Sequence, residues 1–155
     1  GLTLGSYWGY FRNRDSIMNM DHAYNEYVSH TVLGILYKQS VVEENEKTTY
    51  QIDELDAIHS VIEKFIFFVQ PKWKIANDTP GSGNTRNIGG IASVSKLLAG
   101  QGPFAQFGED IFDDYWMGYF NKADAQRAGI GSPHYSNLDT YKQYVNNKSK
   151  ISKRL

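Results

Sequence analysis

Residues 52–71 read IDELDAIHSVIEKFIFFVQP, and this stretch decides the predicted fold. Its apolar side chains recur at spacings of three and four residues, the period of one face of an amphipathic helix. Thr48 or Thr49 can cap the start of such a helix, and Pro71 ends it because proline lacks the backbone N–H that a helix interior needs. The sequence therefore predicts a helix over residues 51–69. Its apolar stripe comprises Ile52, Leu55, Ile58, Ile62, Phe65, Ile66 and Val69.

The segment before this stretch shows the same period. Asp15 or Ser16 can cap a helix that runs to about Gln39. The acidic cluster of Glu43, Glu44 and Glu46 then forms a polar connector. Two antiparallel helices joined by a short turn are the expected arrangement. The apolar stripe of the earlier helix comprises Ile17, Met20, Tyr24, Tyr27, Val28, Thr31 and Ile35.

The chain after Pro71 is predicted to form shorter helices around one long glycine-rich loop at about residues 77–90, where turn-forming residues gather. Short helices are expected from Ile88 or Gly90 to Leu98, where Gly100 and Gly102 end the first, from Pro103 to Tyr119, over 121–128, and after a cap at Ser136. No convincing pair of strands is found. The predicted fold class is all-α, an irregular bundle of five or six helices.

Composition indicates a single globular domain. The 155 residues are 41% hydrophobic and 21% charged, which is ordinary for a folded domain of this length. We expect residues 1–155 to form one helical domain with an aromatic N-terminal arm at 1–14 and a basic C-terminal tail at 146–155. The absence of cysteine excludes disulfides and thiolate metal ligands.

Charge and hydropathy limit the expected partners. The net charge of −1 argues against broad nucleic-acid or membrane-surface binding, which draws on a basic excess. No apolar run approaches the roughly 20 residues that a membrane span requires. We therefore expect no nucleic-acid partner and no membrane span, and the sequence indicates no compartment.

Histidine and glutamate side chains offer a candidate metal site. His22, Glu26 and His30 lie four residues apart on one helical stripe, and His59 begins a similar spacing further on. Imidazole and carboxylate are ligands for zinc or iron. The helical wheel places this stripe opposite the apolar face, whereas ligands of a metal in a bundle core point inward. We interpret the stripe as a solvated face and predict no metal.

Two further motifs fail as catalytic or phosphate-binding patterns. Ser93 and Lys96 have the Ser-x-x-Lys spacing of penicillin-interacting enzymes, but the accompanying Ser-Asp-Asn and Lys-Thr-Gly elements are missing from the sequence. The glycines of residues 81–90 could aim backbone amides at an anion, yet neither the Walker nor the dinucleotide pattern is present. Only Arg86 beside a flexible loop remains. The sequence therefore assigns no catalytic and no cofactor-binding residue.

Two aromatic clusters give the clearest indication of a binding surface in the sequence. Residues 7–11 and 115–120 carry similar aromatic strings, which indicates either chance or a worn duplication. A helix that is apolar nearly all round is buried on several sides. Either the N-terminal arm folds back over residues 115–120, or a partner covers one cluster, since aromatic residues are enriched in such contacts. The candidate partner-binding residues are Trp8, Tyr10, Phe11, Trp116 and Phe120.

These observations favour a non-enzymatic accessory or scaffold subunit that docks on a larger assembly of other protein subunits through its aromatic surfaces. The prediction leans against an enzyme because every catalytic pattern fails. The alternative is a small enzyme or ligand-binding domain that uses His22, His30, His59 or Arg86.

Overall fold

The structure is a computed structural model, and it describes residues 2–7, 21–22, 26–39, 49–58, 60–81 and 86–152. The chain divides into two compact units, which we call unit 1 and unit 2. Unit 1 comprises Gly1–Thr31 and Gln70–Leu155, and unit 2 comprises Val32–Val69. Both contain strands, and unit 1 also contains five α-helices among its described residues. The all-α prediction is therefore wrong, and the fold is mixed α and β.

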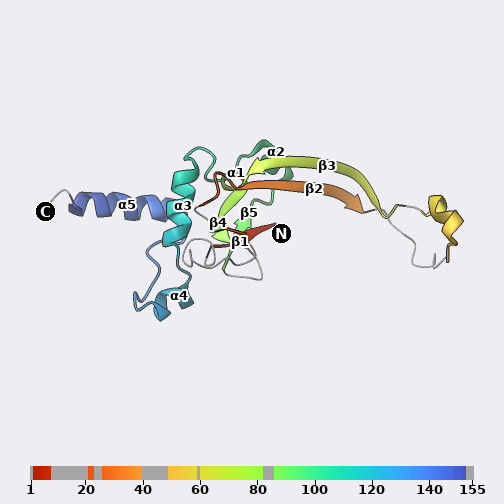
Figure 1. The fold of residues 1–155 in the computed structure, drawn as a ribbon. Helices are drawn as coiled ribbons and strands as arrows, with labels where there is room; N and C mark the ends of the chain where they lie inside the picture. Colours follow the sequence, from red (N-terminus) through yellow and green to blue (C-terminus); the bar gives the residue numbers. More distant parts are fainter. Residues whose placement is uncertain are drawn as a thin grey trace. The chain divides into compact units, whose positions relative to one another are not determined.

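Unit 2 holds most of a two-stranded sheet. Strand β2 (Thr31–Gln39) pairs with strand β3 (Ile62–Pro71), and the two run in opposite directions (Figure 1). Between them lies the short 3-10 helix η3 (Ile52–Ala57). Residues 31–39 and 62–69 are therefore strand where helices were predicted. The part of the first predicted helix at 16–20 and 23–25 lies outside the described residues.

The misassigned strands have a physical explanation. In β2, exposure alternates along Thr31–Tyr37, as it does in a strand whose two faces differ in exposure. In β3, four apolar β-branched or aromatic residues follow one another at 65–68, so the run satisfies a period of two as well as one of 3.6. Branched and aromatic side chains fit a pleated sheet, and their contacts with side chains of the paired strand favour a strand over a helix.

Unit 1 is built on a three-stranded antiparallel sheet. Strand β1 (Thr3–Ser6) pairs with β5 (Asn87–Gly90), and β5 pairs with β4 (Ala76–Pro80), in the order β1-β5-β4 (Figure 1). A Cβ at Gly89 would lie 2.7 Å from the carbonyl oxygen of Thr79, so close strand packing requires glycine there. The predicted loop at 77–90 is thus in large part a strand pair.

Most helices of unit 1 come after its sheet along the chain. The exception is α1 (Lys72–Ile75), which precedes β4. After β5 come α2 (Val94–Ala99), α3 (Glu109–Gly118), α4 (Lys122–Arg127) and α5 (Leu138–Ser152). Helices form in the four places predicted for that region, but α2 begins at Val94 and not at Ile88 or Gly90, and α3 begins at Glu109 and not at Pro103. Ser93 caps α2 by accepting a bond from the amide of Lys96, which gives the Ser-x-x-Lys spacing a structural origin. The start of α5 is capped by the side chain of Asn137, not Ser136 as predicted. No helix in the described part of the chain is long and apolar enough to cross a membrane.

Aromatic side chains form the core of unit 1. Tyr115 lies at its centre: its hydroxyl donates to the carbonyl oxygen of Asp78 at 2.6 Å, and its own carbonyl accepts from the hydroxyl of Tyr135 at 2.6 Å. Burial raises the pKa of Tyr115 well above its usual range. The bonds satisfy polar atoms that burial would otherwise penalise. The most completely buried side chains are Tyr7, Ile75, Ile88, Phe104, Phe112, Tyr115 and Trp116.

Candidate functional site

A buried carboxylate with two arginines is the most distinctive charged group of unit 1. Oδ1 of Asp124 accepts a hydrogen bond from Nη2 of Arg86 and one from Nη1 of Arg127, each at 3.2 Å. The Asp124 side chain is 1% exposed, whereas those of Arg86 and Arg127 are 41% and 66% exposed. The three residues together carry one net positive charge at the surface of the unit.

Local structure explains where Asp124 lies. Asn121 caps α4, and its side-chain oxygen accepts from the amide of Asp124 at 2.8 Å, which fixes the third residue of that first turn. The side-chain nitrogen of Asn121 contacts the hydroxyl of Tyr7 at 3.4 Å. Tyr7 is fully buried and stacks on Trp116, with ring centroids 5.2 Å apart. The cap is thereby tied to the aromatic core.

Arg86 comes from the other side of the site, where the chain enters β5. Its carbonyl accepts from the amide of Tyr7 at 3.0 Å, and the amide of Gly81 donates to the carbonyl of Asn87 at 2.9 Å. The first bond joins the end of β1 to the start of β5, and the second closes the base of the connection between β4 and β5. Residues 82–85 lie outside the described part of the chain. The position of Arg86 is therefore set by the sheet.

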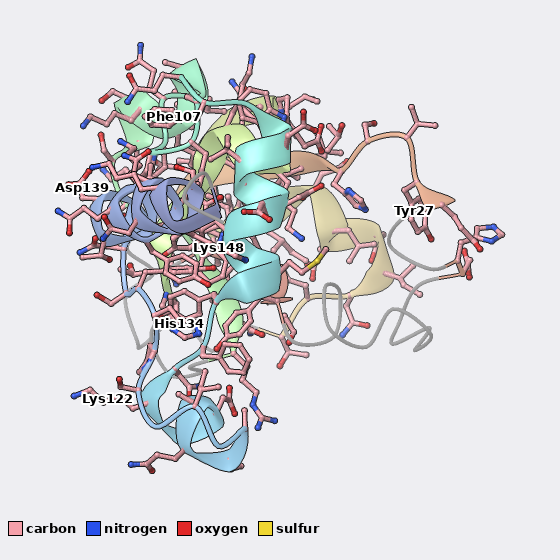
Figure 2. The ribbon with its side chains drawn as sticks, turned by 90° about the vertical axis from the view of Figure 1, so that its left-hand side faces the viewer. Tyr27, Phe107, Lys122, His134, Asp139 and Lys148 are labelled. Carbon is pink, nitrogen blue, oxygen red and sulfur yellow. The ribbon has the colours of Figure 1, made fainter. Side chains whose placement is uncertain are left out.

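This arrangement suits the binding of an anion. A guanidinium group carries five N–H donors in a planar fork that matches the oxygens of carboxylates and phosphates. Figure 2 shows a further cation on α4, Lys122, whose side chain extends away from the helix. Lys122 is exposed. The two guanidinium groups, one from α4 and one from the start of β5, lie together at Asp124.

The histidines predicted as candidate ligands do not form one site. His22 pairs with Glu26, with Nδ1 and Oε2 3.4 Å apart, and both side chains are largely exposed. The ring of Tyr27 contacts those of both His22 and His30, with centroids 6.0 and 5.5 Å away, and His30 adjoins Lys72. His59 lies outside the described residues. Among the residues that the structure describes, no group of three or more histidine or acidic side chains could hold a metal ion.

His30 and Lys72 form a titratable pair inside unit 1. The amide of Lys72 donates to the carbonyl of His30 at 2.8 Å. Burial, and secondly the charge of Lys72, lowers the pKa of His30 to about 4. Burial also lowers the pKa of Lys72 to about 8, against the opposing effect of the Asp113 carboxylate. Lys72 is 6% exposed, whereas His30 is half-buried.

The aromatic residues predicted to bind a partner lie in different places. Trp116 is fully buried against Tyr7, which is the contact expected if the N-terminal segment folds back. Phe120 is half-buried and lines a cavity of about 450 Å³. In that cavity His134, labelled in Figure 2, stacks on Tyr144. Trp8, Tyr10 and Phe11 lie outside the described residues. Their role in partner binding stays a prediction.

Comparison with known proteins decides the family. The model of the family described as restriction endonuclease EcoRV matches residues 1–146. The type II restriction enzyme EcoRV of Escherichia coli is 33% identical over 145 residues, which are 93% of this chain. The chain belongs to the EcoRV restriction endonuclease family. It spans 56% of the length of the Escherichia coli enzyme.

Membership of the EcoRV family corrects three predictions. The non-enzymatic scaffold subunit, the leaning against an enzyme and the expectation of no nucleic-acid partner are all wrong, because the family is one of endonucleases. The argument from net charge failed because affinity for nucleic acid depends on cations gathered at the contact, and a chain of net charge −1 can still gather them locally.

Sequence reasoning found one member of the charged site and missed two. Arg86 was singled out because it follows a glycine-rich stretch. Asp124 and Arg127 lie 38 and 41 residues further along, on a short helix whose sequence shows only ordinary alternating charge. A buried aspartate carries no mark in a single sequence. The one available signal was Asn121, a capping residue three positions before Asp124.

Proposed function

We propose that this chain acts in a restriction endonuclease, binding DNA and taking part in hydrolysis of its phosphodiester backbone. The observation that carries the proposal is the family match, which runs through residues 1–146 without being confined to one motif. The Escherichia coli relative is named as a type II restriction enzyme. Exposed cations on unit 1, Arg86, Lys122 and Arg127, support the binding of a phosphate backbone.

Hydrolysis is not assigned to a described residue. Nucleases commonly hold one or two divalent cations that activate water and stabilise the leaving oxygen, with carboxylates as ligands. The described part of this chain offers no set of three or more such ligands in one place. We therefore derive no step of bond cleavage from these residues and propose for them a role in holding the DNA.

The binding proposal is tested by fluorescence anisotropy with a labelled DNA duplex and the purified chain. Binding is expected to weaken as salt rises, with log K falling linearly against log salt by about 0.9 for each phosphate neutralised. Cleavage is tested separately, with plasmid DNA, magnesium and the protein expressed from its complete gene, and discrete fragments are expected. A chain that shows no salt-dependent affinity for duplex DNA contradicts the binding role.

A further inference from the structure

We propose that Arg86 and Arg127, held together by Asp124, form a binding site for a single phosphodiester group. The inference rests on the proposed function and goes further, since it names the residues and the group that they bind. Asp124 is then a positioning residue, because it acts through the two arginines. The three side chains come from the start of β5 and from α4.

The geometry brings two like charges together. Both guanidinium groups donate to the same oxygen of Asp124, each at 3.2 Å, so their nitrogen atoms lie within two hydrogen-bond lengths of each other. Two guanidinium groups at such a short distance repel each other unless an anion lies between them. The single carboxylate offsets one of the two charges, and one positive charge remains to attract a phosphate.

Exposure shows which parts of the cluster a ligand can reach. The carboxylate is buried, while 41% of the Arg86 side chain and 66% of the Arg127 side chain are in contact with solvent. A phosphate approaching from solvent therefore meets the arginines and not the acid. Arginine binds phosphate oxygens through two parallel N–H donors, and such charge-assisted bonds are stronger than neutral ones.

The burial of Asp124 argues for a positioning role over a purely stabilising one. Its second oxygen, Oδ2, is buried and has no hydrogen-bond partner among the residues that the structure describes. A buried carboxylate that leaves acceptor capacity unused is costly, and an apolar residue is often as stable or more stable at such a place. A role in holding the two arginines in place accounts for the presence of Asp124 at this buried position.

The site is also anchored before any ligand arrives. Asp124 is fixed through the Asn121 cap and Arg86 through its backbone bond to Tyr7, and Asn121 contacts the same tyrosine. Side chains held in place in this way lose less conformational entropy when they bind. A preorganised pair of arginines is what recognition of one phosphate group in a fixed position requires.

The decisive experiment exploits the sign of a charge change. Asp124→Asn removes one negative charge, so long-range electrostatics alone would strengthen DNA binding. If Asp124 positions the arginines, the same substitution should instead weaken binding of the duplex, by roughly tenfold, the worth of one charge-assisted hydrogen bond. Asp139→Asn is the matched control, because Asp139 is an 89% exposed acid on α5 that pairs with Lys142 (Figure 2). That control should bind DNA as well as the unmodified chain, or slightly better.

Arg86→Ala and Arg127→Ala supply the second measurement, and each leaves one arginine on Asp124, so the fold is retained. Each should reduce the slope of log K against log salt by about 0.9. A residue of only structural importance would lower the melting temperature without changing that slope. The site is overturned if the unmodified chain binds DNA and both slopes stay unchanged, or if folded Asp124→Asn binds more tightly. If the unmodified chain does not bind DNA at all, the proposed function fails as well.

Discussion

Units 1 and 2 use apolar side chains in opposite ways. In unit 1 the large aromatic residues are buried against one another, as in the cluster of Tyr7, Tyr115 and Trp116. In the described part of unit 2, Phe68 is the one buried side chain, and residues such as Leu33 and Phe67 are 70% and 66% exposed. Large apolar side chains thus occur in both units, but the buried ones lie mostly in unit 1.

The difference shows where folding free energy is gained. Burial of apolar area contributes about 25 cal/mol per Å², and exposed apolar area contributes nothing. An isolated two-stranded hairpin is marginally stable at best, whereas a sheet packed against helices supports itself. Unit 1 has such a sheet, with α3 and its aromatic residues, and it also carries the cluster of Asp124, Arg86 and Arg127.

The largest expected effect separates the two units directly. Trp116→Ala should lower the free energy of unfolding by about 3–5 kcal/mol, the range for truncating a buried aromatic residue. Phe67→Ala, in β3, should cost less than about 1 kcal/mol because most of that ring is already in solvent. Urea denaturation of each variant measures both losses. It is monitored by the circular dichroism of the backbone, because tryptophan fluorescence would itself change when Trp116 is removed. Equal losses for the two variants would contradict the division between a packed and an exposed unit.

The fold could be predicted from the sequence where local signals are sufficient. Gly100 ends α2 as predicted, because a helix end of this kind depends on neighbouring residues alone. The caps at Ser93 and Asn121 are equally local, although they were not predicted. Strands β2 and β3 could not be recognised in the same way. Their runs are apolar on both faces and fit two periods, and the choice depends on a partner strand more than 20 residues away.

The charged site could be predicted only in part for a similar reason. Arg86 adjoins glycines that attract attention by themselves, but its partner Asp124 is 38 residues distant. Only the folded chain brings them together, through the sheet on one side and the Asn121 cap on the other. The expectation of a long loop at 77–90 also left out the strand pair β4–β5 that positions Arg86.

A second prediction concerns charge inside unit 1. The pKa of Lys72 is lowered from 10.5 to about 8, chiefly by burial, so between these values the unfolded chain binds more protons than the folded one. Stability from this group is therefore present above pH 10.5, falls as pH decreases and is lost below about pH 8. Lys72→Met removes the cost and should raise stability at pH 7 by up to about 3 kcal/mol. The gain should shrink as pH approaches 10, which urea denaturation at pH 7 and pH 9.5 measures.

The matched control for Lys72 lies in unit 2. Lys38 is an exposed lysine of β2, and Lys38→Met should leave the free energy of unfolding nearly unchanged at both pH values. Lys72→Met should also raise the pKa of His30 from about 4, because the charge of Lys72 contributes to lowering it. An NMR titration reports that change. A destabilised Lys72→Met variant at pH 7 would show that the bonds of Lys72 outweigh its burial cost.

The smallest predicted effect tests a packed contact of unit 2. Gly34 on β2 faces Phe68 on β3, and an added Cβ would overlap the ring. Gly34→Ala should therefore open the β2–β3 hairpin locally, at the low end of the roughly 1–3 kcal/mol that overpacking costs, because the half-exposed hairpin can adjust. Hydrogen exchange should speed up at the amides of β2 and β3 and stay unchanged in α3. Combining it with Phe68→Leu should restore part of the protection, since the smaller side chain leaves room for the methyl group. Faster exchange throughout α3 would instead show that the two units unfold together, and the contrast between them would then hold for burial but not for stability.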